Sequence, residues 1–187
     1  TFMVRTPSVP NTLFRCFSHR WAALPLLTLL LSGSALAADP FRTGPKARPM
    51  GPALEKAFED FFRNGSYLNS SQKLNAAQAE NPNEPLVYTL QAALAYMNNQ
   101  PERMQAMAQK TRQVAEAMPA KDEARSHLYR GLAKGLEGAG DYLKNGDSAL
   151  PSILTKVPSM LLEINTAHRK APDDPEINLI VGYIDTV

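Results

Sequence analysis

Three stretches of this chain share one spacing of residues, and that spacing constrains the fold more than any other feature. In each stretch, steps of four and three residues lead to a proline five residues further on. Steps of four and three keep side chains on one helical face, and proline ends a helix because it lacks a backbone N–H. The pattern therefore predicts three helices that pack by one stripe and stop near a proline. The residues are Ser70, Leu74, Ala77 and Pro82; Met107, Thr111, Val114 and Pro119; and Met160, Ile164, Ala167 and Pro172.

The segments between these helices predict that consecutive helices pair as antiparallel hairpins. Asn64-Gly65 and Asn98-Asn99 are short turn signals, and a gap this short makes neighbouring helices run antiparallel. Residues 81–87 also match residues 171–177 in the positions of two prolines and of the acidic residue before the second proline. We therefore expect an all-α fold, an α-solenoid of stacked hairpins, with an irregular helical bundle as the alternative. The expected repeats span residues 51–84, 85–121, 122–174 and, as a truncated fourth repeat, 175–187.

The third repeat is longer than the others, and its composition predicts an irregular connection. Five glycines lie between residues 131 and 146. A short helix over residues 148–156 is expected to fill the connection between the two main helices. Pro158 is expected in the first turn of the next helix, where its missing N–H has no cost.

The first 37 residues have the three-part layout of a secretory signal peptide. A basic start precedes the apolar run Trp21–Leu31, and Ala35-Leu36-Ala37 supplies the small residues that signal peptidase requires. A membrane anchor is the alternative, but the run has about half of the roughly 20 apolar residues of a spanning helix. We therefore expect export with cleavage after residue 37 or 38. Residues 38–50, which include three prolines, are expected to form an extended arm or a linker.

Removal of the signal changes the charge and the cysteine content of the chain. It takes three of the 20 Lys and Arg residues and leaves 17 basic against 18 acidic residues, a net charge of −1. A near-neutral surface gives no electrostatic basis for binding nucleic acid or an anionic membrane. The single cysteine, Cys16, leaves with the signal, so helix packing has to stabilise the remaining residues. Residues 38–187 are numerous enough for one domain with a hydrophobic core.

The ionisable and nucleophilic residues form no convergent catalytic pattern. Glu123 and His127 are four residues apart and could face one metal ion, but an exposed helix face explains two ligands without a third better. His168 lies at a helix end, where positive charge suits the helix dipole. The serines lack a suggestive His and Asp spacing, and the glycines lack the spacing of a phosphate-binding loop. The sequence therefore predicts a protein that is not an enzyme, with no cofactor and no metal site.

Two stretches resemble the tetratricopeptide repeat family. Residues from Gly65 through Pro82 resemble the turn and second helix of that repeat, and Val181-Gly182 resembles the Leu-Gly step of its first helix. Phe58 and Thr111 depart from the family pattern, which has a small residue and an aromatic residue there. The resemblance covers about residues 51–187, and the exported, proline-punctuated form resembles cyanobacterial secreted repeat proteins.

The resemblance implies a concave groove, lined by the first helix of each repeat, that binds a segment of another protein. The Lys and Asn set with which some relatives clamp a terminal carboxylate is not matched here. Tyr96 and Arg130 are the expected strongest contributors, because aromatic and arginine side chains dominate binding hot spots. The insertion over residues 138–157 is the alternative binding surface. The implied groove residues point away from the hairpin partner and are Glu55, Glu59 and Phe62; Thr89, Ala93 and Tyr96; Ser126, Arg130 and Lys134; and Leu179 and Tyr183.

Two functions are compatible with these observations. The first is an exported, non-catalytic scaffold or assembly adaptor that binds a protein or peptide, with no nucleic acid and no stable membrane insertion after signal cleavage. Its expected location is the periplasm or the extracellular space, or the thylakoid lumen in a cyanobacterium. The second is an accessory repeat module of a longer exported enzyme whose catalytic part lies beyond residue 187. The uncapped apolar helix over residues 177–187 favours a longer protein.

Overall fold

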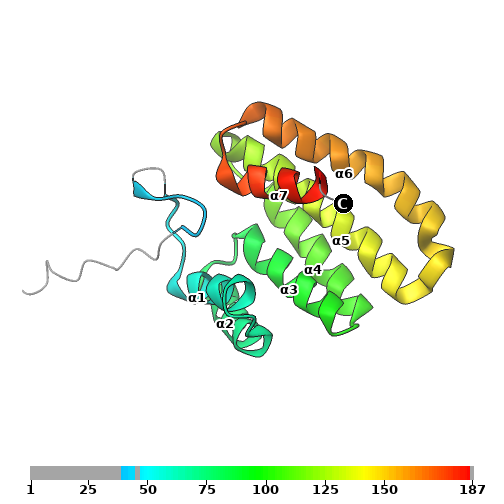
Figure 1. The fold of residues 1–187 in the computed structure, drawn as a ribbon, viewed down its shortest axis with the longest axis horizontal. Coiled ribbons are helices and arrows are strands. Elements are labelled where there is room, and N and C mark those ends of the chain that lie inside the picture. Colours follow the sequence, from blue (N-terminus) through cyan, green and yellow to red (C-terminus); the bar gives the residue numbers. More distant parts are fainter. Residues whose placement is uncertain (1–38, 45–46, 186–187) are drawn as a thin grey trace, which may run out of the picture. The chain divides into compact units, whose positions relative to one another are not determined.

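The computed structural model describes residues 39–44 and 47–185, and the predicted signal peptide lies outside these residues. The described residues form helices and no β-strand, which confirms the predicted all-α class (Figure 1). Two short 3₁₀ helices, η2 (Ala120–Asp122) and η3 (Gly146–Ala149), precede α5 and α6. The α-helices are α1 (Pro52–Phe62), α2 (Tyr67–Glu80), α3 (Pro85–Met97), α4 (Pro101–Glu116), α5 (Glu123–Asn145), α6 (Leu150–Lys170) and α7 (Pro175–Asp185).

The three repeated stretches form the helices α2, α4 and α6, as the spacing predicts. The central pair of each stretch is buried: Leu74 and Ala77 in α2, Thr111 and Val114 in α4, and Ile164 and Ala167 in α6. The closing prolines Pro82, Pro119 and Pro172 lie two or three residues beyond the last helical residue. Local periodicity and proline chemistry therefore determine where these helices lie and which face they bury.

Consecutive helices pack as pairs in the order expected for hairpins. The main contacts join α1 to α2, α3 to α4 and α5 to α6, and α4 also packs extensively against α5. Smaller contacts join α2 to α3, α3 to α5 and α6 to α7. Asn99 and Gly65 adopt positive φ angles of 52° and 62° in the two short turns, which explains the residue types found there.

The third hairpin corrects the interpretation of its sequence. Gly131, Gly135, Gly138 and Gly140 lie inside the continuous helix α5 and not in a connection. Residues 150–156, expected in a separate short helix, belong to α6, and Pro158 lies inside α6 and not in its first turn. The additional residues of this repeat therefore lengthen both helices of the hairpin, and the connection is the short segment η3.

The glycines of α5 allow neighbouring helices to approach it closely. A Cβ atom at Gly131 would lie 2.6 Å from Cγ1 of Ile164 and 3.1 Å from the carbonyl oxygen of Met160, both on α6. A Cβ atom at Gly140 would lie 2.9 Å from Cγ of Gln105 on α4. Close packing on two sides therefore explains glycine in a helix interior, where it lowers intrinsic helix stability.

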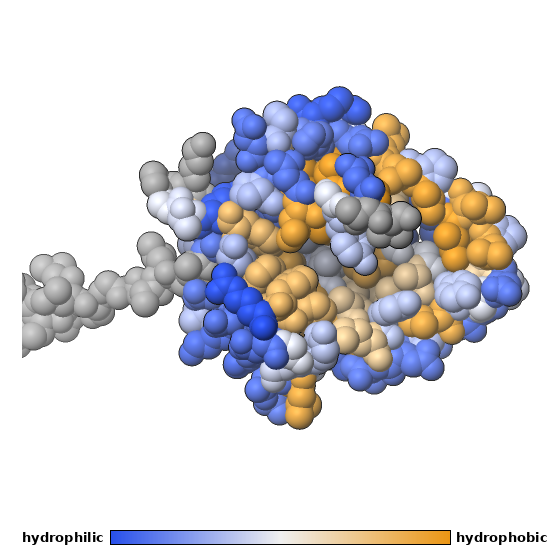
Figure 2. All heavy atoms as spheres, in the orientation of Figure 1, coloured by the Kyte–Doolittle hydropathy of each residue, from blue (hydrophilic) through white to orange (hydrophobic). Residues whose placement is uncertain are grey.

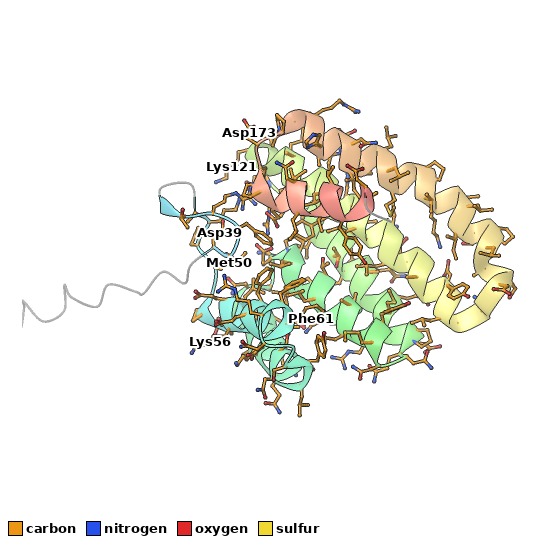
Figure 3. All side chains as sticks on the ribbon, viewed as in Figure 1. Asp39, Met50, Lys56, Phe61, Lys121 and Asp173 are labelled. Carbon is orange, nitrogen blue, oxygen red and sulfur yellow. The ribbon has the colours of Figure 1, made fainter. Side chains whose placement is uncertain are left out.

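Residues 39–44 and 47–50 form an arm that packs on the helices instead of a free linker. Asp39 and Met50 are buried, and the Phe41 ring meets the Phe58 ring of α1 at 5.2 Å with an edge-to-face geometry. Figure 3 shows Asp39 on the part of the arm that faces the start of α7. The arm is therefore part of the folded domain.

Candidate functional site

All eleven residues of the predicted groove lie on α1, α3, α5 and α7, and each keeps at least part of its surface accessible. Phe62 and Tyr96 are about half exposed, at 55% and 50%, and Leu179 and Tyr183 are also exposed. Glu59 is exposed, while Glu55, Thr89 and Ala93 are half-buried. Phe62 also packs against two rings of its own helix, with centroids 4.6 Å from Phe58 and 4.8 Å from Phe61.

The predicted groove residues of α5 are held by contacts with neighbouring helices. Ser126 Oγ donates to the carbonyl oxygen of Ala115 on α4 at 2.7 Å. Arg130 Nη2 donates to Oε2 of Glu163 on α6 at 2.7 Å, and Lys134 Nζ lies 3.4 Å from Oε1 of the same carboxylate. Arg130 and Lys134 therefore reach toward their hairpin partner α6, whereas the family resemblance implied side chains that point away from it.

His127 joins the same carboxylate, because its Nδ1 lies 2.7 Å from Oε2 of Glu163. Burial raises the pKa of Glu163, but His127 and Arg130 outweigh burial and hold that pKa below its usual value. Nε2 of His127 lies 3.8 Å from Oε1 of Glu123, the second residue of the pair considered for a metal ion. The part of the chain that the structure describes contains no group of three or more His, Cys, Asp and Glu side chains placed to hold a metal.

The densest ionic cluster was not predicted from the sequence and connects the arm, α3, α5 and α7. Glu176 of α7 is 2% exposed and accepts from Arg125 Nε at 2.9 Å, Tyr129 Oη at 2.5 Å and Arg48 Nη1 at 2.8 Å. Arg125 also donates from Nη1 to Oε2 of Glu84 at 3.0 Å. The arm and α5 therefore both bring arginines to the buried carboxylate of α7, and Arg125 links this carboxylate to Glu84 at the start of α3.

The arm completes this cluster. Arg42 donates to both Asp39 and Asp174, and Asp39 also accepts from the backbone N–H of Arg48 at 3.0 Å. Burial raises the pKa of Asp39, Asp174 and Glu176, but the arginines and backbone donors outweigh it, so all three carboxyls have a lowered pKa. Since these groups bond to one another, we interpret the cluster as a structural one that holds the arm and α7 against α5.

A pocket of about 290 Å³ opens between the end of α3 and the lengthened hairpin of α5 and α6. Two predicted groove residues, Tyr96 and Lys134, line it. The sequence did not assign the other lining residues to the groove, because it placed the glycines of α5 and residues 148–156 in a connection and Met160 on the packed face of the next helix. They are Gly135, Gly138, Ala139 and Tyr142 of α5, and Ile153, Lys156, Val157 and Met160 of α6.

The sequence matches no protein-family model, and it has no significant match among curated proteins or solved structures. Among the described residues, no helix is both long enough and apolar enough to cross a bilayer.

Proposed function

We propose that this protein is an exported, non-catalytic scaffold of tetratricopeptide-like helical hairpins that binds a segment of another exported protein. The observation that carries the proposal is the open apolar pocket together with the exposed apolar side chains beside it. Tyr96, Tyr142 and Leu150 are about half exposed, and Leu154 is 71% exposed. Exposed apolar surface gathered around a concavity is typical of protein interaction sites.

The hairpin order supports the repeat part of the proposal. Each first helix packs on the second helix before it, and α3 also contacts α5, as expected where similar units are stacked. Glu84 and Asp174, which correspond in the two similar segments, both precede a helix and accept a hydrogen bond from its first-turn backbone. Because a fold does not determine a function, the binding role has to be tested directly.

Site-specific photocrosslinking in exporting cells tests the binding role. We would replace Tyr96 by p-benzoylphenylalanine and place the same group at Gln72, an exposed position on α2, as a matched control. A discrete crosslinked partner at position 96 and none at 72 is the expected result. Replacing Leu154 by glutamate should abolish that crosslink, while far-ultraviolet circular dichroism stays unchanged. Equal crosslinking at both positions, or none at 96, would contradict the proposed role.

Export is a separate part of the proposal, supported by the layout of residues 1–37. Amino-terminal sequencing of protein made in the source cells should begin at Ala38 or Asp39. Recovery of uncut protein from the cytoplasm would refute this part and leave the binding role open.

A further inference from the structure

The lengthened half of the third hairpin carries a surface that is unusual for an exposed helix. From Leu150 to Leu162, α6 contains only one charged residue, Lys156. On this stretch Leu154 is 71% exposed and Leu162 is 63% exposed. Helices at the surface of soluble proteins normally present charged and polar residues to water. Figure 2 shows apolar surface over the end where α5 and α6 meet.

Beside this surface lies the pocket, and its floor is built for an apolar group. Ile153, Val157 and Met160 of α6 and Ala139 of α5 line it together with two tyrosines. A Cβ atom at Gly138 would have only one neighbour within 4 Å, Cγ1 of Ile153 at 3.8 Å. Glycine at this position therefore leaves room at the pocket wall, and about 290 Å³ is enough for one or two large side chains.

The charged residues that line the pocket are positive. Lys134 and Lys156 are its charged lining residues, and none of the described residues that line it is acidic. Lys134 Nζ donates to Ser159 Oγ and lies 3.4 Å from Glu163, while Lys156 donates to Asp141. Each ammonium has three N–H donors, so both lysines keep capacity for a further acceptor.

The two carboxylates that the lysines contact, Asp141 and Glu163, also accept hydrogen bonds from other residues. Asp141 also accepts from Gln105 at 2.8 Å and from Ser152 at 3.0 Å, and Glu163 also accepts from Arg130 at 2.7 Å. With Lys134, Lys156 and Arg130 against Asp141 and Glu163, the local charge is three positive against two negative groups. A ligand carboxylate would therefore meet net positive charge, and a ligand ammonium would meet repulsion.

Building on the proposed scaffold function, we infer that this pocket binds a partner segment in which a leucine- or phenylalanine-type side chain is flanked by carboxylates. The apolar side chain enters between Ile153 and Tyr96, and the flanking carboxylates pair with Lys134 and Lys156. Leu150 and Leu154, on the adjoining exposed face of α6, cover the rest of the segment. The lengthened hairpin is thus a binding element in addition to the groove implied by the repeat resemblance.

Chemical-shift perturbation with two defined peptides tests this inference. The probes are acetyl-Glu-Leu-Phe-Glu-amide and acetyl-Lys-Leu-Phe-Lys-amide, which share the apolar pair and differ in charge. They are titrated into the ¹⁵N-labelled protein in its exported form, and the backbone amides of Gly135, Gly138 and Ala139 are followed. The acidic peptide should shift these amides and bind at least about 10-fold more tightly than the basic peptide.

Three variants separate the apolar contribution from the ionic one. Gly138→Leu fills the pocket and should abolish binding of both peptides, while Gly138→Ala verifies that the helix accepts a side chain there. Lys134→Gln combined with Lys156→Gln should keep the pocket and reduce the preference for the acidic peptide to about 2-fold or less. Circular dichroism of each variant checks that the helices persist.

Several results would overturn the inference. The first is the absence of any shift at the amides of Gly135, Gly138 and Ala139 up to millimolar peptide. The second is equal or tighter binding of the basic peptide, and the third is binding that Gly138→Leu leaves unchanged. A concentration-dependent dimer that Leu154→Glu dissociates would identify a second copy as the occupant and would also overturn it. A crosslinked partner at position 96 without the charge preference would leave the scaffold function standing and reject only the partner chemistry.

Discussion

The packing of α5 against α6 can be tested by giving two glycines of the same helix the same new methyl group. Alanine is about 0.8 to 1 kcal/mol more favourable than glycine in a helix interior, so propensity alone stabilises both Gly131→Ala and Gly138→Ala. The surroundings differ. A Cβ atom at position 131 would lie 2.6 Å from Cγ1 of buried Ile164 and 3.1 Å from a backbone oxygen of α6. At position 138 the nearest atom is 3.8 Å away.

These distances determine the expected magnitude. Carbon atoms in contact normally lie about 3.5 to 4.0 Å apart, so alanine at position 131 requires a displacement of about 1 Å in a packed interface. Overpacking of this kind costs about 1 to 3 kcal/mol. Gly138→Ala should therefore stabilise the protein by about 0.5 to 1 kcal/mol, and Gly131→Ala should be less stable than Gly138→Ala by about 1 to 3 kcal/mol.

Urea unfolding followed by circular dichroism measures this difference. With a slope of about 2 kcal/mol/M, a difference of 2 kcal/mol separates the two midpoints by about 1 M. Gly135→Ala should fall between them, because its Cβ atom would meet the flexible Met160 Sδ at 2.8 Å. If Gly131→Ala stabilises the protein as much as Gly138→Ala, then Gly131 does not set the separation of α5 and α6, and the close-packing argument is wrong.

Three further predictions concern the core and the ionic cluster. Leu74→Ala should cost about 2 to 5 kcal/mol of stability because Leu74 is fully buried. Leu68→Ala, at an exposed position of the same helix, should change stability by less than about 0.5 kcal/mol. Urea unfolding of both variants checks which face of the helix is buried. Glu176→Gln removes one of the two carboxylates that pair with buried Arg125 and should cost about 3 to 5 kcal/mol by the same assay. Glu102→Gln, in an exposed pair, should cost less than about 1 kcal/mol. The pKa values of the Asp39, Asp174 and Glu176 carboxyls are lowered in the folded protein. Their ion pairs therefore stabilise the fold fully at a pH above the unfolded-state pKa values of about 4. This stabilisation is lost as the pH falls through the lower pKa values of the folded state. Thermal unfolding from pH 7 to pH 2 should show this loss, and an unchanged midpoint in that range would contradict the assigned ion pairs.

Local sequence rules predicted the helices because the determining residues lie close together in the chain. The three repeated stretches lie in α2, α4 and α6, and the predicted turn residues Gly65 and Asn99 lie just before α2 and α4. In each case a proline or a turn residue lies within a few positions of the helix end. Such signals act through the backbone of their own segment and do not depend on the tertiary structure.

The same rules failed at the glycines of α5 because glycine has two opposite structural uses. It ends helices by accepting positive φ, and it also allows two helices to approach closely. Gly131, Gly135 and Gly138 are spaced by four and three residues, which is the spacing that identified the other packed faces. That spacing predicts a seam on one face of a helix, whereas a loop places no such constraint on its glycines.

The ionic cluster could not be derived from local signals, because Arg125 and Glu176 are 51 residues apart and Arg42 and Asp174 are 132 apart. One indication was nevertheless present in the similarity of residues 81–87 and 171–177. In that alignment Glu176 occupies the position of Leu86, which is 6% exposed. A carboxylate at a buried repeat position requires a buried cationic partner, and Arg125 provides it.

The two unpredicted features of α5 also indicate where the protein has capacity to bind. At the start of α5, the arginines and carboxylates of the cluster bond to one another, so a ligand there would have to displace existing ion pairs before it could form new ones. At the other end of the helix, Tyr142 and the α6 leucines remain exposed beside an open pocket, and burying them would gain about 25 cal/mol for each Å² removed from water. The gain from burying apolar surface is therefore larger at the lengthened end of the hairpin.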